Sequence, residues 1–390
     1  MEKLKINETP RRTARNFRIN NITLENIEIP EKVGEFKNIE IKNLNSKTSN
    51  SNNSANDKLN TDIVIDTKSK ISNMLVYGLG ETLTNLVNDK ANANLKISIK
   101  NDDITNKSRK EKATSGNNKE KNAEKEAEID FKFDKENQDL IENIEINAKE
   151  NSKSTIILKY EQQEDIEAFH NGIIKTNAKK NSEINIILIN LLNQKSNNFI
   201  SIENTFEENA KINYTIVDFG GKNSITNYYS NMIGDNSDNQ LNTIYLGKKD
   251  QVFDLNYIGE LRGKKTNINI DVQGALKDKS KKHFKGTIDF KKGCKKAVGN
   301  ESEACMLLSD TAKSIALPML LCSEEEVEGN HSSSAGKIGE KELFYIMSRG
   351  FSFKEAMKLM VRARFNKILE NIKNEELKQE IVKEIDEKLD

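Results

Sequence analysis

The chain has 390 residues, of which 31% are charged and only 35% hydrophobic, so a thick core of several packed layers is not expected. Lys plus Arg and Asp plus Glu both number 61, so the formal charge is zero and no overall field favours nucleic acid or an anionic membrane. The charged N-terminus lacks the apolar centre of a secretion signal, and no apolar run is long enough to span a bilayer, so we expect a cytoplasmic protein.

Residues 1–150 form an N-terminal region that two low-complexity tracts divide, at about residues 43–60 and 101–128. The first tract is rich in Asn and Ser and the second in Lys, Glu and Asn. Neither holds enough apolar side chains to offset the entropy of ordering, so we interpret both as disordered loops or insertions. Between them, Met74–Gly78 predicts a short strand and Glu81–Val87 a helix.

The middle of the chain, residues 151–338, predicts many short strands. Apolar side chains alternate with mostly polar ones at 184–188, 212–216, 253–257, 268–272 and 284–290, which is the pattern of half-buried strands. With only three prolines, Gly and Asn are expected to supply most turns. An all-β sandwich, a barrel or a solenoid all fit this pattern. A solenoid suits a thin core, because each coil needs only one layer of inward side chains.

From residue 339 to 390 the apolar period becomes helical. Gly350 is suited to the left-handed end of a first helix, and Ser352 with Glu355 has the spacing of a capping box for a second. Asn374 can cap a third helix. The apolar stripe of the second helix either packs on its own domain or docks a partner, and both interpretations stay open. The stripe consists of Met357, Met360, Val361, Phe365, Ile368, Leu369 and Ile372.

Common catalytic motifs are absent from the sequence. It has no phosphate-binding G-x-x-x-x-G-K-[ST] loop, no H-E-x-x-H and no G-x-S-x-G. Asp254, Asp271 and Asp289 could form the acidic cluster of a solenoid carbohydrate-active enzyme, but their polar strand positions favour solvated carboxylates. We therefore expect a protein that is not an enzyme and has no intrinsic cofactor.

The three histidines and three cysteines are candidates for metal ligation. His170 lies in a turn-like stretch and His283 before a strand, and a lone histidine is more often a surface or hydrogen-bonded residue than a ligand. The short polar neighbours of His331 leave its imidazole accessible for metal ligation or proton exchange. Cys322 is either a small buried apolar residue or a soft metal ligand. An odd number of cysteines without C-x-x-C spacing fits a reducing compartment.

Several stretches together resemble a known family. Gly329–Ile338 (GNHSSSAGKI), Glu342–Tyr345 (ELFY) and Met347–Gly350 (MSRG) look like the C-terminal signature of the SufB/SufD family. The similarity runs in order from about residue 154 to residue 371. Ser332 follows His331 where the scaffold with the principal cysteine role usually has Glu, which favours the SufD branch. Further similar stretches are Phe169–Gly172, Ile244–Gly247, Asp271–Asp278 and Leu320–Glu324.

The resemblance implies a right-handed parallel β-helix (solenoid) over residues 151–338, between an N-terminal mixed region and a C-terminal helical domain at 339–390. It also implies a complex with a SufB-like scaffold and a SufC-like ATPase, which docks on the C-terminal helices. His331 would take part in forming a transient iron-sulfur cluster shared with the SufB-like chain, and Cys322 is a weaker candidate ligand. The candidate docking residues are Phe344, Arg349, Gly350, Met357, Met360, Val361 and Phe365.

The sequence therefore predicts a scaffold subunit of the SUF iron-sulfur cluster assembly complex. One alternative keeps the family but makes the chain the SufB-type scaffold. The other belongs to a different class, a β-solenoid carbohydrate-active enzyme or adhesin, and such proteins normally carry a secretion signal.

Overall fold

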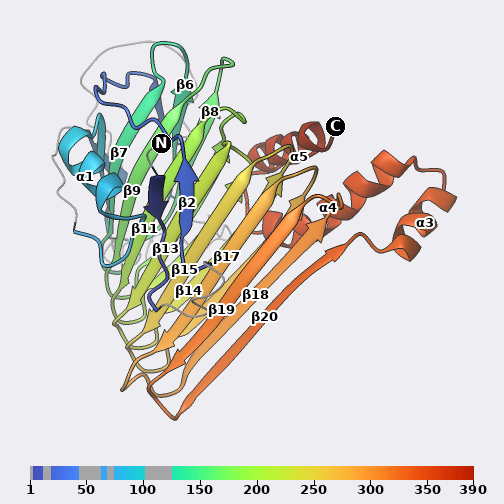
Figure 1. Ribbon diagram of the computed structural model, residues 1–390. Coiled ribbons are helices and arrows are strands. Elements are labelled where there is room, and N and C mark those ends of the chain that lie inside the picture. Colours follow the sequence, from blue (N-terminus) through green and yellow to red (C-terminus); the bar gives the residue numbers. More distant parts are fainter. Residues whose placement is uncertain (1–2, 12–18, 44–62, 68–73, 102–124) are drawn as a thin grey trace, which may run out of the picture.

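The chain winds into a β-solenoid of about seven turns, as Figure 1 shows. This computed structural model describes residues 3–11, 19–43, 63–67, 74–101 and 125–390. Each coil places one strand in each of two sheets, and within each sheet the strands of successive coils are neighbours. The parallel β-helix with C-terminal helices that the resemblance implied is confirmed, and the sandwich and barrel alternatives are wrong.

Each sheet contains nine strands among the described residues. In spatial order, sheet 1 holds β20 (Val327–Lys337), β18 (Ala297–Leu307), β16 (Asn267–Leu276), β14 (Asp238–Gly247), β12 (Lys211–Asp218), β10 (Glu183–Leu191), β8 (Lys153–Gln162), β6 (Lys125–Phe133) and β3 (Ile39–Asn43). Sheet 2 holds β19 (Lys313–Cys322), β17 (Lys281–Phe290), β15 (Val252–Leu261), β13 (Asn223–Met232), β11 (Asn197–Phe206), β9 (Phe169–Ala178), β7 (Asp139–Ala148), β5 (Ala93–Ile99) and β4 (Ile63–Asp66). Only β3 and β4 pair antiparallel to their neighbours in these sheets.

The solenoid begins earlier in the chain than the predicted boundary at residue 151, because β5, β6 and β7 already belong to the two sheets. Residues 125–128, the end of the second low-complexity tract, form the start of β6. The rest of that tract, from 102 to 124, and residues 44–60 of the first lie outside the described residues.

The strand predicted at Met74–Gly78 is wrong, whereas the helix after it is confirmed as α1 (Glu81–Lys90). The segment before α1 bonds to side chains of sheet 2 rather than to a neighbouring strand. Val76 donates its N–H to the Glu203 carboxylate at 2.8 Å, and Leu79 donates its N–H to Ser201 Oγ at 3.2 Å.

Asparagines in the left-handed conformation close one corner of successive coils. Asn151, Asn181 and Asn209 have φ of 57° or 58°, which Asn tolerates better than most residues. Asn181 lies 30 residues after Asn151, and Asn209 lies 28 residues after Asn181, which sets the length of a coil. The side-chain amide of each later residue donates to the Oδ1 of the earlier one, at 3.0 and 2.9 Å. The prediction that Asn supplies turns is confirmed at this corner.

Apolar side chains fill the space between the two sheets in stacked rows. Because side chains alternate across a strand, residues paired in register on parallel strands occupy the same inward position in successive coils. One such row of sheet 1, fully buried along its whole length, is Ile156, Ile186, Tyr214, Leu241 and Ile270. Each coil thus contributes one inward layer, as expected for a solenoid.

The outer faces of both sheets are also covered. Leu83, Leu86 and Val87 of α1 pack on sheet 2, together with the antiparallel pair β1 (Lys3–Ile6) and β2 (Ile22–Glu25). On the other side of the molecule, α4 (Phe353–Leu369) and α5 (Glu375–Leu389) pack on sheet 1 (Figure 1). The molecule therefore has three apolar layers in place of the single thin core expected from composition.

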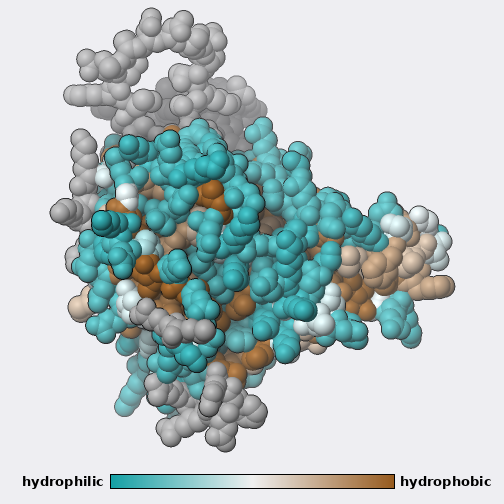
Figure 2. Space-filling view, turned by 45° about the horizontal axis from the view of Figure 1, so that its top comes forward, coloured by the Kyte–Doolittle hydropathy of each residue, from teal (hydrophilic) through white to brown (hydrophobic). Residues whose placement is uncertain are grey.

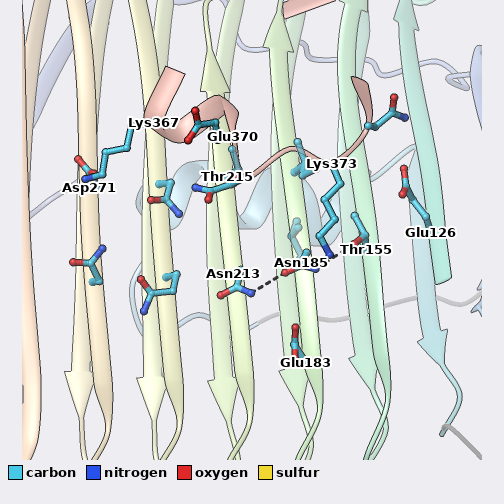
Figure 3. Close-up of a pocket in the computed structure, with 17 residues that line it drawn as sticks. Glu126, Thr155, Glu183, Asn185, Asn213, Thr215, Asp271, Lys367, Glu370 and Lys373 are labelled. Carbon is cyan, nitrogen blue, oxygen red and sulfur yellow. Dashed lines mark hydrogen bonds and ion pairs between the residues drawn. The ribbon is translucent and has the colours of Figure 1, made fainter. Parts of the chain in front are cut away.

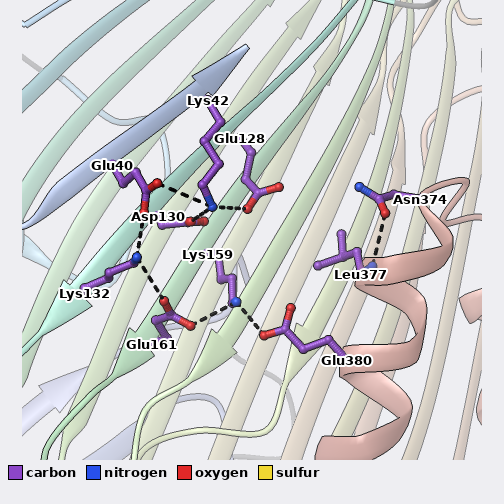
Figure 4. Close-up of polar contacts among 10 residues, drawn as sticks. All are labelled: Glu40, Lys42, Glu128, Asp130, Lys132, Lys159, Glu161, Asn374, Leu377 and Glu380. Carbon is purple, nitrogen blue, oxygen red and sulfur yellow. Dashed lines mark hydrogen bonds and ion pairs between the residues drawn. The ribbon is translucent and has the colours of Figure 1, made fainter. Parts of the chain in front are cut away.

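The helix caps predicted from sequence are present. Ser352 and Glu355 form the full capping box at the start of α4, and Asn374 accepts from the Leu377 N–H at 3.1 Å at the start of α5. Lys159 on β8 joins α5 to sheet 1, because its Nζ lies 2.5 Å from the Glu380 carboxylate and 2.9 Å from that of Glu161 (Figure 4).

Candidate functional site

The last coil leaves the solenoid open at one end. In the part of the chain that the structure describes, β20 pairs only with β18 and β19 only with β17. Every residue of β20 after Val327 is exposed, and β20 lies at the outer edge of the molecule in Figure 1. An edge strand offers unpaired N–H and C=O groups to another chain. We call β19 and β20 the open end.

His331, the main candidate ligand, lies on β20 and is exposed. Its register partner on β18 is Glu301, which places it on the inward face of sheet 1, next in the row that runs from Ile156 to Ile270. Cys322 ends β19 on the other sheet, where it is also exposed, and its thiol donates to the Glu324 carbonyl at 2.9 Å. The interpretation of Cys322 as a buried residue is therefore wrong, and both candidates lie at the open end.

A charged cluster, which the sequence reasoning missed, lies beneath the open end. Glu303 on β18 is 2% exposed and forms a 2.6 Å ion pair with Lys282 of β17, which is fully buried. Tyr245 and Ser333 also donate hydrogen bonds to Glu303, at 3.2 and 2.8 Å. The signal in the sequence was the period-two pattern of Ala297–Leu307, which puts glutamates where earlier strands have mostly Ile, Leu or Val.

Glu301 is the second buried carboxylate of this cluster. It is 3% exposed, and burial, followed by the charge of Glu303, raises its pKa to about 8. Its carboxylate lies over Gly286 of β17, where a Cβ would come within 2.2 Å of it. The absence of a side chain at Gly286 thus makes room for the acid.

The predicted docking residues divide into two groups. Val361 and Phe365 are buried between α4 and sheet 1, and Met360 is partly buried against the same apolar cluster. Met357 is also buried, at 7% exposed. The prediction that Met357, Val361 and Phe365 dock a partner is wrong, because their side chains are buried within the chain itself. Only part of the Met360 side chain is exposed. Of the two interpretations of the stripe, packing on the chain's own core is the correct one.

The remaining docking candidates lie on a projecting arm, α3 (Glu340–Ser348) with the turn that follows it to Ser352. No residue of α3 is buried, and Phe344 is 74% exposed. Figure 2 shows apolar residues gathered on this projecting part. Arg349 stacks on the Tyr345 ring, with 5.1 Å from its guanidinium carbon to the ring centroid. Gly350 has φ of 100°, the left-handed end that the sequence predicted.

Two other interpretations of polar residues are wrong. His170 lies in β9 rather than in a turn, and it is fully buried, with Nδ1 2.7 Å from Asn198 Oδ1.

The three aspartates are not solvated, since each is buried and paired with a lysine. Asp254 pairs with Lys285, Asp271 with Lys367 and Asp289 with Lys291. Asp271 lies on sheet 1 and the other two on sheet 2, so the three form no acidic cluster.

A polar groove of about 660 Å³ lies between the outer face of sheet 1 and the α4–α5 turn (Figure 3). Asn213 and Asn185 on its floor are joined by a 2.8 Å hydrogen bond, and Lys367 at its rim pairs with Asp271. None of the candidate ligands or docking residues lines this groove.

Within the described ranges, no group of three or more His, Cys, Asp and Glu side chains is arranged to hold a metal ion. The same ranges contain no helix that is both long and apolar enough to cross a bilayer. Any cluster or ion bound at the open end would therefore need ligands beyond those that this chain brings together.

These features define a class: a two-sheet parallel β-solenoid with a free sheet edge, charged groups under its last coil, and a projecting helical arm. Residues 131–364 match the family model "SUF system FeS cluster assembly, SufBD core domain". The chain belongs to this family of iron-sulfur cluster assembly proteins, and the resemblance seen in the sequence is confirmed.

Curated relatives agree with the family match. The chain is 26% identical to the iron-sulfur cluster assembly protein SufD of Bacillus subtilis, over 46% of this chain and 41% of that protein. It is 36% identical to a SufBD family protein of Pyrococcus horikoshii, over 42% of this chain and 36% of the other. It is 22% identical to the iron-sulfur cluster assembly protein SufD of Escherichia coli, over 63% of this chain and 58% of that protein. The matches span between about a third and three fifths of these relatives.

Proposed function

We propose that this chain is a scaffold subunit of the SUF iron-sulfur cluster assembly complex, of the SufD type, and that it has no catalytic activity of its own. The free edge of β20 with the exposed His331 on it is the observation that carries the proposal. Relatives named SufD in two organisms support the subunit type.

The open end is where a SufB-like scaffold would pair. An exposed edge strand can extend the sheet of a second chain through backbone hydrogen bonds. Such pairing would bring His331 to the seam between the chains, where its imidazole could serve as one ligand of a transient cluster. Thiolates of the SufB-like partner would supply softer ligands, and a mixed site of this kind suits a cluster that must be released.

The arm is where a SufC-like ATPase would dock. Its exposed aromatic side chains are unusual for a surface, and an aromatic residue with Arg beside it is typical of interface hot spots. The docking candidates reduce to those on the arm, Phe344, Arg349 and Gly350, because the α4 candidates are buried.

The test is co-expression with the neighbouring scaffold and ATPase genes. Phe344→Asp should lower the affinity for the ATPase by at least about tenfold, because replacing an aromatic hot-spot residue of an interface costs about 2 kcal/mol or more. Since Phe344 packs in no core, the variant should fold normally. Met74→Asp is the matched control, because Met74 is 90% exposed and lies far from the arm in sequence.

Retention of the ATPase by the Phe344→Asp variant would contradict docking on the arm. Failure of the wild-type chain to co-purify with either partner would contradict the proposed function as a whole.

A further inference from the structure

One inward row of side chains in sheet 1 changes from apolar to polar at the open end. From β8 to β16 this row consists of the apolar or aromatic residues Ile156 to Ile270. The next two positions are Glu301 on β18 and His331 on β20. A carboxylate and an imidazole thus replace the apolar core in the last two coils.

The Glu301 carboxylate forms no ion pair or hydrogen bond within the described part of the chain. It is 3% exposed, and among the described residues neither of its carboxylate oxygens has a hydrogen-bond partner. Glu303, two residues along the same strand, is bonded to Lys282, Tyr245 and Ser333. Buried carboxylates nearly always have a hydrogen-bond partner, so the Glu301 carboxylate has room for one from outside the chain, an ordered water or an ion.

The geometry places the two residues within reach of one ion. Glu301 and His331 are paired in register on adjacent strands, so their side chains lie on the same face. Paired strands are about 4.8 Å apart, which suits a carboxylate oxygen and an imidazole nitrogen that share one ion. First-row divalent metals accept this combination of ligands.

We propose that Glu301 and His331 form a carboxylate–imidazole pair that binds a ferrous ion at the open end. The inference rests on the proposed function, in which His331 meets the cluster, and adds Glu301 as a ligand. Two protein ligands make a weak site, which a partner chain would complete. A weak site allows the iron to be passed on as cargo.

The test is anaerobic titration with Fe²⁺ of the full chain, alone and in its complex with the scaffold partner. Glu301→Gln preserves shape and removes the ligand charge, and His331→Ala removes the imidazole. Each should weaken Fe²⁺ binding at least about tenfold. The losses of Fe²⁺ affinity in the two single variants should not add up in the double variant, because both residues would hold one ion.

The matched control is Glu328→Gln. Glu328 is also on β20, but it is exposed and pairs with Val298, on the outward face. Its replacement should leave Fe²⁺ affinity unchanged. Glu301→Asp, which keeps the charge, should retain part of the affinity. Thermal unfolding of each variant checks that the fold is intact.

The competing explanation is that Glu301 is a buried neutral acid. In that case Glu301→Gln would bind Fe²⁺ as tightly as the wild type, and the inference would be overturned. Absence of Fe²⁺ binding in both the wild-type chain and its complex would overturn it as well. Failure to form the complex is a separate result, which counts against the proposed function and not against the role of Glu301.

Discussion

At the scale of single residues, buried charges hold parts of this chain in place. Asp254 and Lys285 form an ion pair of 2.6 Å on the outer face of sheet 2. Asn7 covers the pair, because its amide donates to Asp254 at 2.5 Å and its carbonyl accepts from Lys285 at 2.7 Å. Burying two charges costs desolvation energy that such contacts only partly offset. We infer that the pair fixes where the N-terminal segment lies rather than adding much stability.

Lys388 on α5 should make stability depend on pH. Burial lowers its pKa to about 7, although Asp218 attracts its charge. Between about pH 7 and 10.5 the unfolded chain binds a proton at Lys388 that the folded chain has lost, so the contribution of Lys388 to stability should rise with pH through this window. Lys388→Met should abolish the rise and be the more stable protein at neutral pH.

Urea unfolding at several pH values measures the effect. Lys383→Met, whose side chain is 75% exposed on the same helix, is the control and should keep the wild-type slope. Asp218 does not interfere, because burial raises its pKa only to about 6, below this window. Identical pH slopes in Lys388→Met and wild type would show that Lys388 stays charged when buried.

At the scale of elements, the three C-terminal helices serve two different purposes although all are amphipathic. The apolar sides of α4 and α5 join outward residues of sheet 1, such as Ile157, Ile189 and Val217, in one apolar cluster. The shorter α3 has no such contact, and its apolar side chains remain exposed. Amphipathicity alone does not distinguish the two cases, because it says only that one face avoids water.

Replacing Ile385 tests the packing of α5. This residue is fully buried, so Ile385→Ala should lower the free energy of unfolding by about 2–5 kcal/mol. Gln379→Ala, at an exposed position of the same helix, should change it by less than about 0.5 kcal/mol. Chemical denaturation of the isolated chain gives both values. An unchanged stability in Ile385→Ala would mean that α5 does not pack on sheet 1 in solution.

At the scale of the whole molecule, both outer faces of the solenoid are covered, and its last coil is left open. Helix α1 with β1 and β2 covers sheet 2, and α4 with α5 covers sheet 1. At the N-terminal end the edge strands are the short antiparallel β3 and β4. At the open end the edge strands are the long β19 and β20, and His331 lies on β20, which is why the proposed pairing with another scaffold falls there.

Deletion of residues from Phe351 onward would expose the outer face of sheet 1. The truncated chain should aggregate and bind an apolar dye such as ANS, because the apolar cluster under α4 and α5 would lose its cover. Light scattering and dye fluorescence measure this, with the full-length Phe344→Asp variant as a control that should remain dispersed. A truncated chain that stays dispersed and binds no dye would show that the helices do not protect the sheet.

Local signals in the sequence predicted much of the fold. The strands at 184–188 and 268–272, the capping box at Ser352 and the left-handed Gly350 follow from side-chain alternation and backbone preferences, which neighbouring residues decide. The stretch around His331 was enough to indicate the family. The role of His331 as a ligand stays a prediction.

Burial could not be predicted in the same way. The local sequence predicts Asp254 as a solvated residue, His170 as a surface or hydrogen-bonded residue in a turn, and Met357 as a docking residue. The contacts that bury these residues are not visible in their local sequence. Asn7 covers Asp254 from 247 residues away, and Met357 is only 7% exposed in the folded chain. By itself, the sequence determined the coils, their turns and the family. Only the tertiary structure decided which outward faces are covered and which charges lie inside, because burial depends on the chain segments that return to each face.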